Sequence, residues 1–186
     1  IRKALRESGN PQVPVISLAA VKLDEQNPGF KLTPNLLKAA VYCVLFGDVM
    51  MQMLYRTRPY EATPGSANAL FEECMERARK LAPKFTRRSF TRLSREAIRA
   101  FDTLPLVGEG TKPRVGVVGE ILVKFHPTAN NHVVEVIESE GCEAVVPGLL
   151  DFFLYSMSNA KVQKDELGSS AASRATMDAV IGLVDW

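Results

Sequence analysis

The sequence is poor in the residues that build metal and disulfide sites. Its 186 residues include three cysteines and two histidines. Cys43, Cys74 and Cys142 lie far apart, are odd in number and form no C-x-x-C pair. This pattern excludes a zinc knuckle and a disulfide framework. Because each cysteine has apolar neighbours in the sequence, we predict three buried free thiols.

The sequence also lacks an export signal and an uninterrupted apolar span. The basic residues near its start precede no apolar core of a signal peptide, so a reducing cytoplasm is the expected setting. The most apolar run, Leu36–Tyr55, contains Lys38, Gly47 and Asp48. These residues argue against a transmembrane helix. For Asp48 we predict either an arginine partner or a local break of the helix at Gly47, in preference to a role in a site.

Several functional classes have no motif here. The chain contains no P-loop, EF-hand loop or Ser/His/Asp set, and Gly116 and Gly119 do not form G-x-G-x-x-G. A net charge of +2 gives no support to nucleic-acid binding. Hydrophobic content of 46% and charged content of 24% are typical of a folded soluble protein. Because the chain starts at Ile1, we expect it to be a segment of a longer protein.

The stretch Arg114–Pro147 is the organising part of the chain. Arg114–Val118 is β-branched and apolar, which predicts a buried parallel strand. A helix is expected from Asn131 to Ile137, capped by Asn130 or Asn131 and stopped by Gly141. Ala144–Val146 would be the next strand. This strand–loop–helix–strand order is the unit of an α/β sheet.

The rest of the chain is predicted to be mostly helical. A first strand is expected at Val15–Ala19, and a helical insertion over residues 33–106 would separate it from the second strand. We divide the chain into residues 1–32 (first helix and strand), 33–106 (insertion), 107–160 (strand–helix–strand core) and 161–186 (a last helical segment). Helices are predicted at Ile1–Ser8, from Thr33-Pro34 to about Arg56, from Thr63 or Ser66 to Pro83, at Phe90–Phe101, Leu149–Met157 and Ser169–Trp186.

Ligands of α/β sheets bind beyond the carboxyl ends of the strands. In this chain that place holds five polar residues within twelve positions: Glu120, Lys124, His126, Asn130 and Asn131. We call the segment Glu120–Asn131 the rim. A helix N-terminus beside a lysine favours an anion, so a cofactor phosphate or a catalytic Glu/His pair is one interpretation. The other is a loop whose polar residues only cap a helix.

Two further charged stretches are candidates. The loop Arg56–Glu61, with Arg58, Tyr60 and Glu61, could bind a carboxylate or phosphate, but a salt-bridged loop that docks the insertion onto the sheet is favoured. The second stretch, Arg77–Arg99, is strongly basic. Its arginines at 88, 92, 95 and 99 form one helical stripe. A solvated face, or one that docks an acidic partner, is favoured over nucleic acid.

Three stretches of this sequence are similar to a known family: Leu5–Leu18, Tyr55–Gly65 and Val115–Pro147 with VGVVGEILVKFHPTANN. They resemble the 2-hydroxyglutaryl-CoA dehydratase D-component family, in the version found in large activator-like proteins of the CoA-substrate-specific enzyme activase type. The resemblance spans most of residues 1–157. It implies a Rossmann-like parallel sheet with helical insertions, so the fold class expected is α/β with a long helical insertion between the first and second strands.

The resemblance also implies a chemistry for the parent protein. Members hold a 4Fe-4S cluster through cysteines, and related enzymes dehydrate 2-hydroxyacyl-CoA after ATP-driven electron transfer from an activase. Our three cysteines do not match the cluster positions, so no cofactor is expected on this segment. By motif, a cluster or acyl-CoA cleft would be lined by Glu120, His126, Pro127, Asn130 and Asn131, and Arg58, Tyr60 and Glu61 would flank it.

The expected partners are the remaining domains of the parent, an acyl-CoA, or a dehydratase or activase subunit, without a membrane. The isolated segment would be inactive. Two alternatives stay open: a non-catalytic scaffold that binds a partner subunit, and a phosphate- or nucleotide-binding α/β domain.

Overall fold

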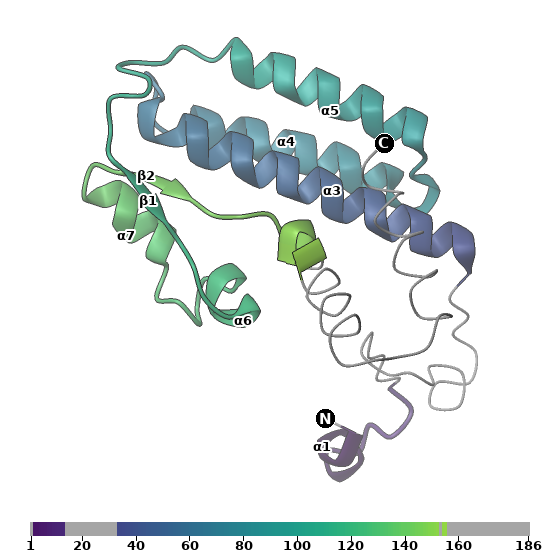
Figure 1. The fold of residues 1–186 in the computed structure, drawn as a ribbon. Coiled ribbons are helices and arrows are strands. Elements are labelled where there is room, and N and C mark those ends of the chain that lie inside the picture. The colour runs from purple at the N-terminus through teal and green to yellow at the C-terminus, as the bar shows by residue number, and fades with distance from the viewer. Residues whose placement is uncertain (1, 14–32, 153, 156–186) are drawn as a thin grey trace, which may run out of the picture. The chain divides into compact units, whose positions relative to one another are not determined.

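The computed structural model describes residues 2–13, 33–152 and 154–155 (Figure 1). The predicted strand Val15–Ala19 and the predicted helix Ser169–Trp186 lie outside the described residues. The chain divides into two units, residues 1–38 and 39–186. In the first, helix α1 (Arg2–Glu7) agrees with the predicted helix, and Gly9 follows it with φ of +80°.

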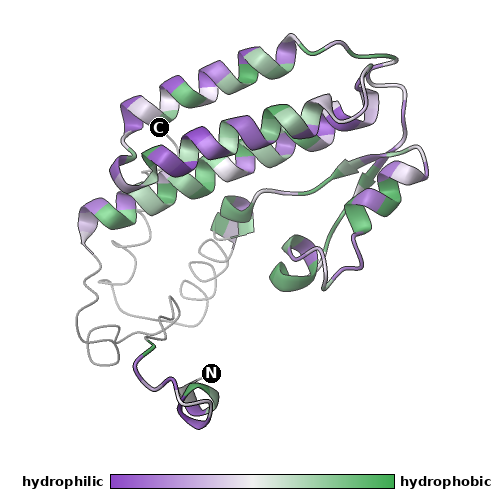
Figure 2. Ribbon diagram, turned by 180° about the vertical axis from the view of Figure 1, so that it is seen from behind, coloured by the Kyte–Doolittle hydropathy of each residue, from purple (hydrophilic) through white to green (hydrophobic). Residues whose placement is uncertain are grey.

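Three long helices form the largest hydrophobic core. They are α3 (Pro34–Thr57), α4 (Ser66–Leu81) and α5 (Arg87–Asp102), which lie side by side in Figures 1 and 2. Each contributes apolar residues at helical spacing, as the sequence predicts. The most deeply buried large side chains are Phe46, Met50, Leu93 and Cys74. Aromatic rings close one part of this core, with Tyr42 stacked on Phe90 at 5.5 Å between ring centroids.

The helix starts show which local signals the chain uses. Thr33 caps α3 as predicted, since its Oγ1 accepts the Leu36 N–H at 3.2 Å. Helix α5 begins before the predicted Phe90, because Thr86 and Ser89 form a reciprocal capping box. The predicted cap of α4 is wrong: neither Thr63 nor Ser66 caps this helix. Its N-cap is Gly65, with φ of +88°.

A two-stranded parallel sheet follows the helices. β1 (Arg114–Gly116) pairs with β2 (Glu143–Val145), with Arg114 opposite Glu143. Between the strands lie α6 (Ile121–Phe125) and α7 (Val133–Ser139). The predicted strand–loop–helix–strand unit is therefore confirmed, although α6 was not predicted, β1 is shorter than expected and β2 begins one residue earlier.

One expectation about this sheet is wrong. All three residues of β1 are exposed, although the β-branched sequence predicts a buried strand. The reason is that the sheet has only two strands among the described residues, so nothing described covers both faces of β1. A smaller core lies next to the sheet, made of Val117, Val134, Ala144 and Val146, and Met51 and Tyr55 of α3 pack against it.

Helix α7 ends as the sequence predicts. Gly141 has φ of +79°, a conformation that glycine adopts without strain. Its N–H donates to the Glu138 carbonyl, and the Cys142 N–H donates to the Ile137 carbonyl. These two bonds form a Schellman motif, which satisfies the last carbonyls of the helix.

Asp48 has a role that the sequence did not indicate. Helix α3 continues through Gly47 without a break, and no described arginine pairs with Asp48. Its carboxylate instead accepts the backbone N–H groups of Leu149 and Leu150, both at 2.8 Å. Residues 149–152 and 154–155 are helical, so Asp48 caps a helix that begins 101 residues later.

The prediction of three buried thiols is correct only in part. Cys74 is buried in the core, but Cys142 is half-buried and Cys43 is exposed on α3. Cys43 is exposed even though its spacing of three and seven residues from Phe46 and Met50 places it on the same side of α3 as those core residues. Burial raises the pKa of the Cys74 thiol.

One helical stretch, Pro34–Tyr60, is long and apolar enough to cross a membrane by length and composition alone. It has a mean hydropathy of 1.4 over the most apolar window. In the structure one side of it carries Phe46, Met50 and Leu54 into the protein core. Leu36, Leu37 and Val41 on this helix are exposed.

Candidate functional site

The rim begins directly beyond the carboxyl end of β1. Val117 continues the ladder by donating its N–H to the Val145 carbonyl at 2.9 Å. Gly119 then turns the chain with φ of +138°, and Glu120 starts helix α6. This is the edge of a parallel sheet at which ligands bind in α/β proteins.

Glu120 is used to cap α6. Its carboxylate accepts the N–H of Leu122 at 2.7 Å and that of Val123 at 3.4 Å. This helix was hard to predict, because glutamate is not among the favoured N-cap residues and the β-branched Ile121 and Val123 favour strands.

Two other rim residues also bond to backbone groups of their own segment. Nδ1 of His126 accepts the Ala129 N–H at 3.3 Å. Oδ1 of Asn130 accepts the Val133 N–H at 3.2 Å. The predicted N-cap of α7 is nevertheless wrong: the N-cap residue is His132, not Asn130 or Asn131, and its side chain makes no capping bond. Asn131 and His132, which lie between Asn130 and Val133 in the chain, have left-handed φ values of +54° and +56°. Glu120 therefore caps a helix, Asn130 bonds the first N–H of α7 from outside the helix, and His126 holds a turn.

Lys124 has a different environment. Its ammonium lies 5.0 Å from the ring centroid of Phe125 and 5.9 Å from that of Phe152. It borders a cavity of about 50 Å³. The cavity is lined by Met51, Tyr55, Lys124, Phe125, Pro127, Asn130, Val134, Glu135 and Val146. That volume admits water but not a nucleotide or CoA, so any ligand of the rim would lie on its outer surface.

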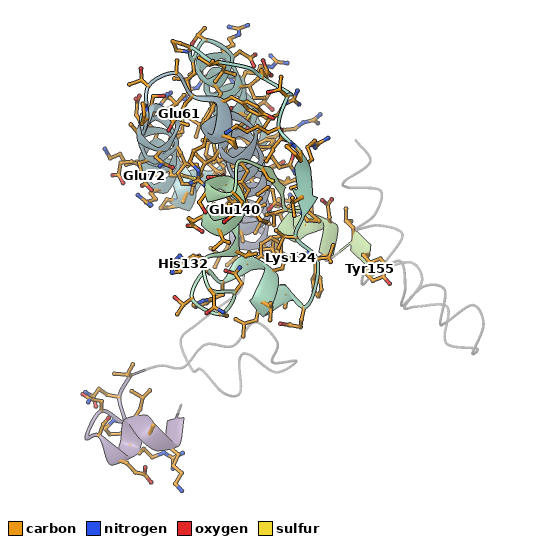
Figure 3. All side chains as sticks on the ribbon, turned by 90° about the vertical axis from the view of Figure 1, so that its left-hand side faces the viewer. Glu61, Glu72, Lys124, His132, Glu140 and Tyr155 are labelled. Atoms are coloured by element: carbon orange, nitrogen blue, oxygen red, sulfur yellow. The ribbon has the colours of Figure 1, made fainter. Side chains whose placement is uncertain are left out.

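The rim and Val118, which lies just before it, expose apolar side chains. Val118 is 82% exposed, Leu122 57% and Val123 48%. Figure 2 shows α6 in the hydrophobic colour, and Figure 3 shows the side chains of this region with Lys124 and His132 labelled. Exposed His126 and Asn131 belong to the same segment. Exposed apolar groups beside polar ones are typical of surfaces that another molecule covers.

Arg58 lies elsewhere and forms a structural ion pair. Its Nε and Nη2 donate to the Glu138 carboxylate at 2.7 and 2.9 Å, a bidentate geometry. Nη1 donates to Asn68 at 3.1 Å, and the guanidinium lies 5.5 Å from the Tyr55 ring centroid. The two charged side chains are 17% and 14% exposed, so this pair is well shielded from water.

Tyr60 and Glu61 also hold elements together. The Tyr60 hydroxyl donates to Oε2 of Glu143 at 3.0 Å, and Arg114 Nε donates to the other carboxylate oxygen at 3.1 Å. Burial of the phenol raises the pKa of Tyr60, and its hydrogen bond to Glu143 acts in the same direction. Glu61 supplies the missing cap of α4 by accepting the N–H of Gly65 at 2.6 Å and that of Ala67 at 2.7 Å.

These contacts correct the expectation that Arg58, Tyr60 and Glu61 flank the rim. Glu143 is the first residue of β2, so Tyr60 lies at the amino ends of the parallel strands. The rim lies beyond their carboxyl ends. The loop instead docks the helices onto the strand–helix unit, which is the interpretation that the sequence favoured. Its partners Glu138 and Glu143 were missed because they lie 80 and 83 residues away.

The described residues do not fit an iron–sulfur cluster. Cys43, Cys74 and Cys142 belong to different parts of the fold, on α3, on α4 and after α7. Across residues 2–13, 33–152 and 154–155 no three His, Cys, Asp or Glu residues gather as a metal site. The site therefore comprises an outward-facing rim and a docking loop at the other end of the sheet. Comparison of the chain with family models, curated proteins and solved structures finds no match.

Proposed function

We propose that this chain is a segment of a 2-hydroxyacyl-CoA dehydratase activator-like protein, and that its rim forms one wall of the cleft in which the parent holds a cluster or an acyl-CoA. The parent would carry out ATP-driven electron transfer or radical dehydration in the cytoplasm. Alone, the segment is inactive and carries no cofactor. The similarity of VGVVGEILVKFHPTANN to that family supports the assignment.

One structural observation carries the proposal. Beyond the carboxyl end of β1, Val118, Leu122 and Val123 expose apolar surface beside the polar groups of His126 and Asn131. Water contact with this apolar surface is unfavourable, at about 25 cal/mol per Å². A covering domain or ligand would relieve that cost. The capping bonds of Glu120, His126 and Asn130 support the wall by fixing its backbone.

The finer fold belongs to the same proposal. In a Rossmann-like sheet, Val15–Ala19 would add a strand to the two observed here, and residues 33–106 would be the helical insertion between strands. The exposed faces of β1 support this, since parallel sheets are normally covered on both faces.

The first experiment compares two chains purified without oxygen. One is the 186-residue chain, and the other is extended at both ends to include flanking cysteines. We expect iron and sulfide in the long chain and none in the short one. A stoichiometric cluster on the short chain, lost on substitution of Cys43, Cys74 or Cys142, would contradict the proposal. Absence of iron from both chains would also contradict it.

The second experiment tests the rim itself in the long chain. Leu122→Ser and Val123→Ser change exposed side chains, so they should leave the fold intact while weakening acyl-CoA binding or altering the cluster spectrum. Val136→Ser is the matched control, since Val136 is 52% exposed on α7. Equal effects of the rim and control variants would refute the role of the rim.

A further inference from the structure

The outward face of α5 carries the densest positive charge in the described part of the chain. Its exposed arginines are Arg87, Arg88, Arg92, Arg95 and Arg99. Together with Thr91 and Glu96 they line an open hollow of about 640 Å³. On the opposite face, Leu93, Ala97 and Phe101 are buried in the helical core. The core therefore fixes which side of α5 the arginines present to the outside.

These arginines lack counter-charges among the described residues. Arg92 reaches Glu96 at 3.9 Å, but Glu96 is already engaged by Arg77 of α4. Arg87, Arg88, Arg95 and Arg99 form no ion pair with any residue in the ranges 2–13, 33–152 and 154–155. Like charges three and four residues apart on a helix are mutually unfavourable. A bound anionic partner would remove that repulsion.

The shape of the charged surface selects the kind of anion. The arginines at 88, 92, 95 and 99 follow steps of four, three and four, which places them in one line along the helix. Eleven residues at 1.5 Å each make this line about 16 Å long. A single phosphate would meet only one or two of the guanidinium groups. An elongated ligand with carboxylates at the same spacing would meet all four.

The aromatic side chains of α5 argue against single-stranded nucleic acid. Phe101 is buried, and Phe90 packs against the rings of Tyr42 and Phe85. The basic face therefore offers no aromatic platform on which bases could stack.

From the charge, the line and the missing counter-charges, we propose that the basic face of α5 docks an acidic helix of a partner protein, with carboxylates at positions i, i+4, i+7 and i+11 facing Arg88, Arg92, Arg95 and Arg99. This surface is separate from the rim and does not depend on the function proposed for it.

Labelled peptides test the proposal directly on the 186-residue chain. The first probe is a helical peptide with glutamates at the four matching positions, and the second has the same composition with the glutamates redistributed around the helix. An RNA oligonucleotide is the third. We expect the matched peptide to bind about tenfold more tightly than the redistributed one, because each exposed ion pair contributes modestly. Added salt should weaken this binding.

Variants then localise the binding. Arg92→Glu with Arg95→Glu should weaken binding of the matched peptide about tenfold or more, and Arg92→Gln with Arg95→Gln should do so without introducing repulsion. The control, Lys38→Glu with Arg56→Glu on α3, makes the same change of net charge and should have little effect. Circular dichroism verifies that each variant is folded.

Three outcomes would overturn the proposal. Equal affinity for the two peptides would show that the binding does not depend on the spacing of the glutamates. Tighter binding of RNA than of either peptide would make this a nucleic-acid surface. Absence of binding by all three probes would leave α5 with a solvated basic face.

Discussion

Asp48 stabilises the helix that starts at Leu149 from a distant part of the chain, and replacing it tests that role. Gly148 occupies the N-cap position but has no side chain to cap with. Asp151 Oδ2 accepts the Gly148 N–H at 3.0 Å, which is one half of a capping box. Asp48 supplies the other half through its bonds to Leu149 and Leu150. Asp48→Ala should therefore destabilise the protein.

The expected loss of stability combines two unfavourable contributions and one that offsets them in part. Removing an N-cap costs about 1–2 kcal/mol, and losing a negative charge at a helix N-terminus costs about 0.5 kcal/mol. Alanine is favoured over aspartate within α3 by about 0.5 kcal/mol, which offsets part of the loss. Asp48→Ala should thus lower the free energy of unfolding by about 1.5 kcal/mol, measured by urea denaturation followed by circular dichroism.

A second substitution makes the prediction specific to this contact. A Cβ atom at Gly148 would lie 2.9 Å from Oδ2 of Asp48. Gly148→Ser should therefore destabilise the wild-type chain by about 1 kcal/mol through crowding. With alanine at position 48 the closest contact is gone, and only Oδ2 of Asp151 remains, at 3.2 Å from the added Cβ. A serine at the N-cap should then stabilise by about 0.5 kcal/mol, provided that the Asp151 side chain shifts slightly. The effect of one substitution changes sign with the residue at the other position.

Two results would refute this reasoning. One is a change of less than about 0.5 kcal/mol for Asp48→Ala, which is within the usual effect of a surface substitution. The other is a stability change of the same sign for Gly148→Ser with aspartate and with alanine at position 48. That result would mean that Asp48 does not contact the start of the helix at Leu149.

Three further predictions, two of them with a control substitution, test the cores and the helix ends. The pKa of Tyr60 is raised above its ordinary value of 10.0, so the stability it contributes is full below about pH 10 and lost as pH rises through the folded-state pKa. Tyr60→Phe should lower stability at neutral pH but make the alkaline decline shallower; an unchanged decline in urea titrations would contradict this. The Ser94 hydroxyl is buried without a hydrogen-bond partner among the described residues, so Ser94→Ala should stabilise by about 1 kcal/mol. The control is Ser89→Ala, which removes a capping group of α5 and should destabilise the protein. If both serine substitutions changed the free energy of unfolding equally, the prediction for Ser94 would be wrong. Gly141→Ala should lower the free energy of unfolding by about 1 kcal/mol because of its positive φ, whereas Gly116→Ala, without that constraint, is the control in thermal melts.

Local signals in the sequence were enough for several elements. Thr33-Pro34 starts α3, because a hydroxyl cap and a fixed proline φ act within one turn. Gly141 ends α7 for an equally local reason, since only glycine reaches its φ readily. The order of strand, helix and strand over Arg114–Val146 follows from hydrophobic spacing alone.

The candidate site could be predicted in position but not in detail. The rim lies beyond the carboxyl end of β1, as the order of elements requires. The sequence could not say that Glu120, His126 and Asn130 bond to neighbouring backbone groups, because the same side chains could equally face a ligand. It also predicted a buried β1, since β-branched residues signal a strand but not what covers it.

Only the tertiary structure decided which charged residues meet. Asp48 caps a helix 101 residues away, Arg58 pairs with Glu138 and Tyr60 bonds to Glu143. None of these pairs has a signature in the local sequence, because helix and strand patterns report spacing over a few residues and carry no information about distant partners. The sequence by itself thus determined the order of the main elements and the ends that carry a local signal, such as the start of α3 and the end of α7. Packing of α3 against the strand–helix unit determined how their charges are satisfied.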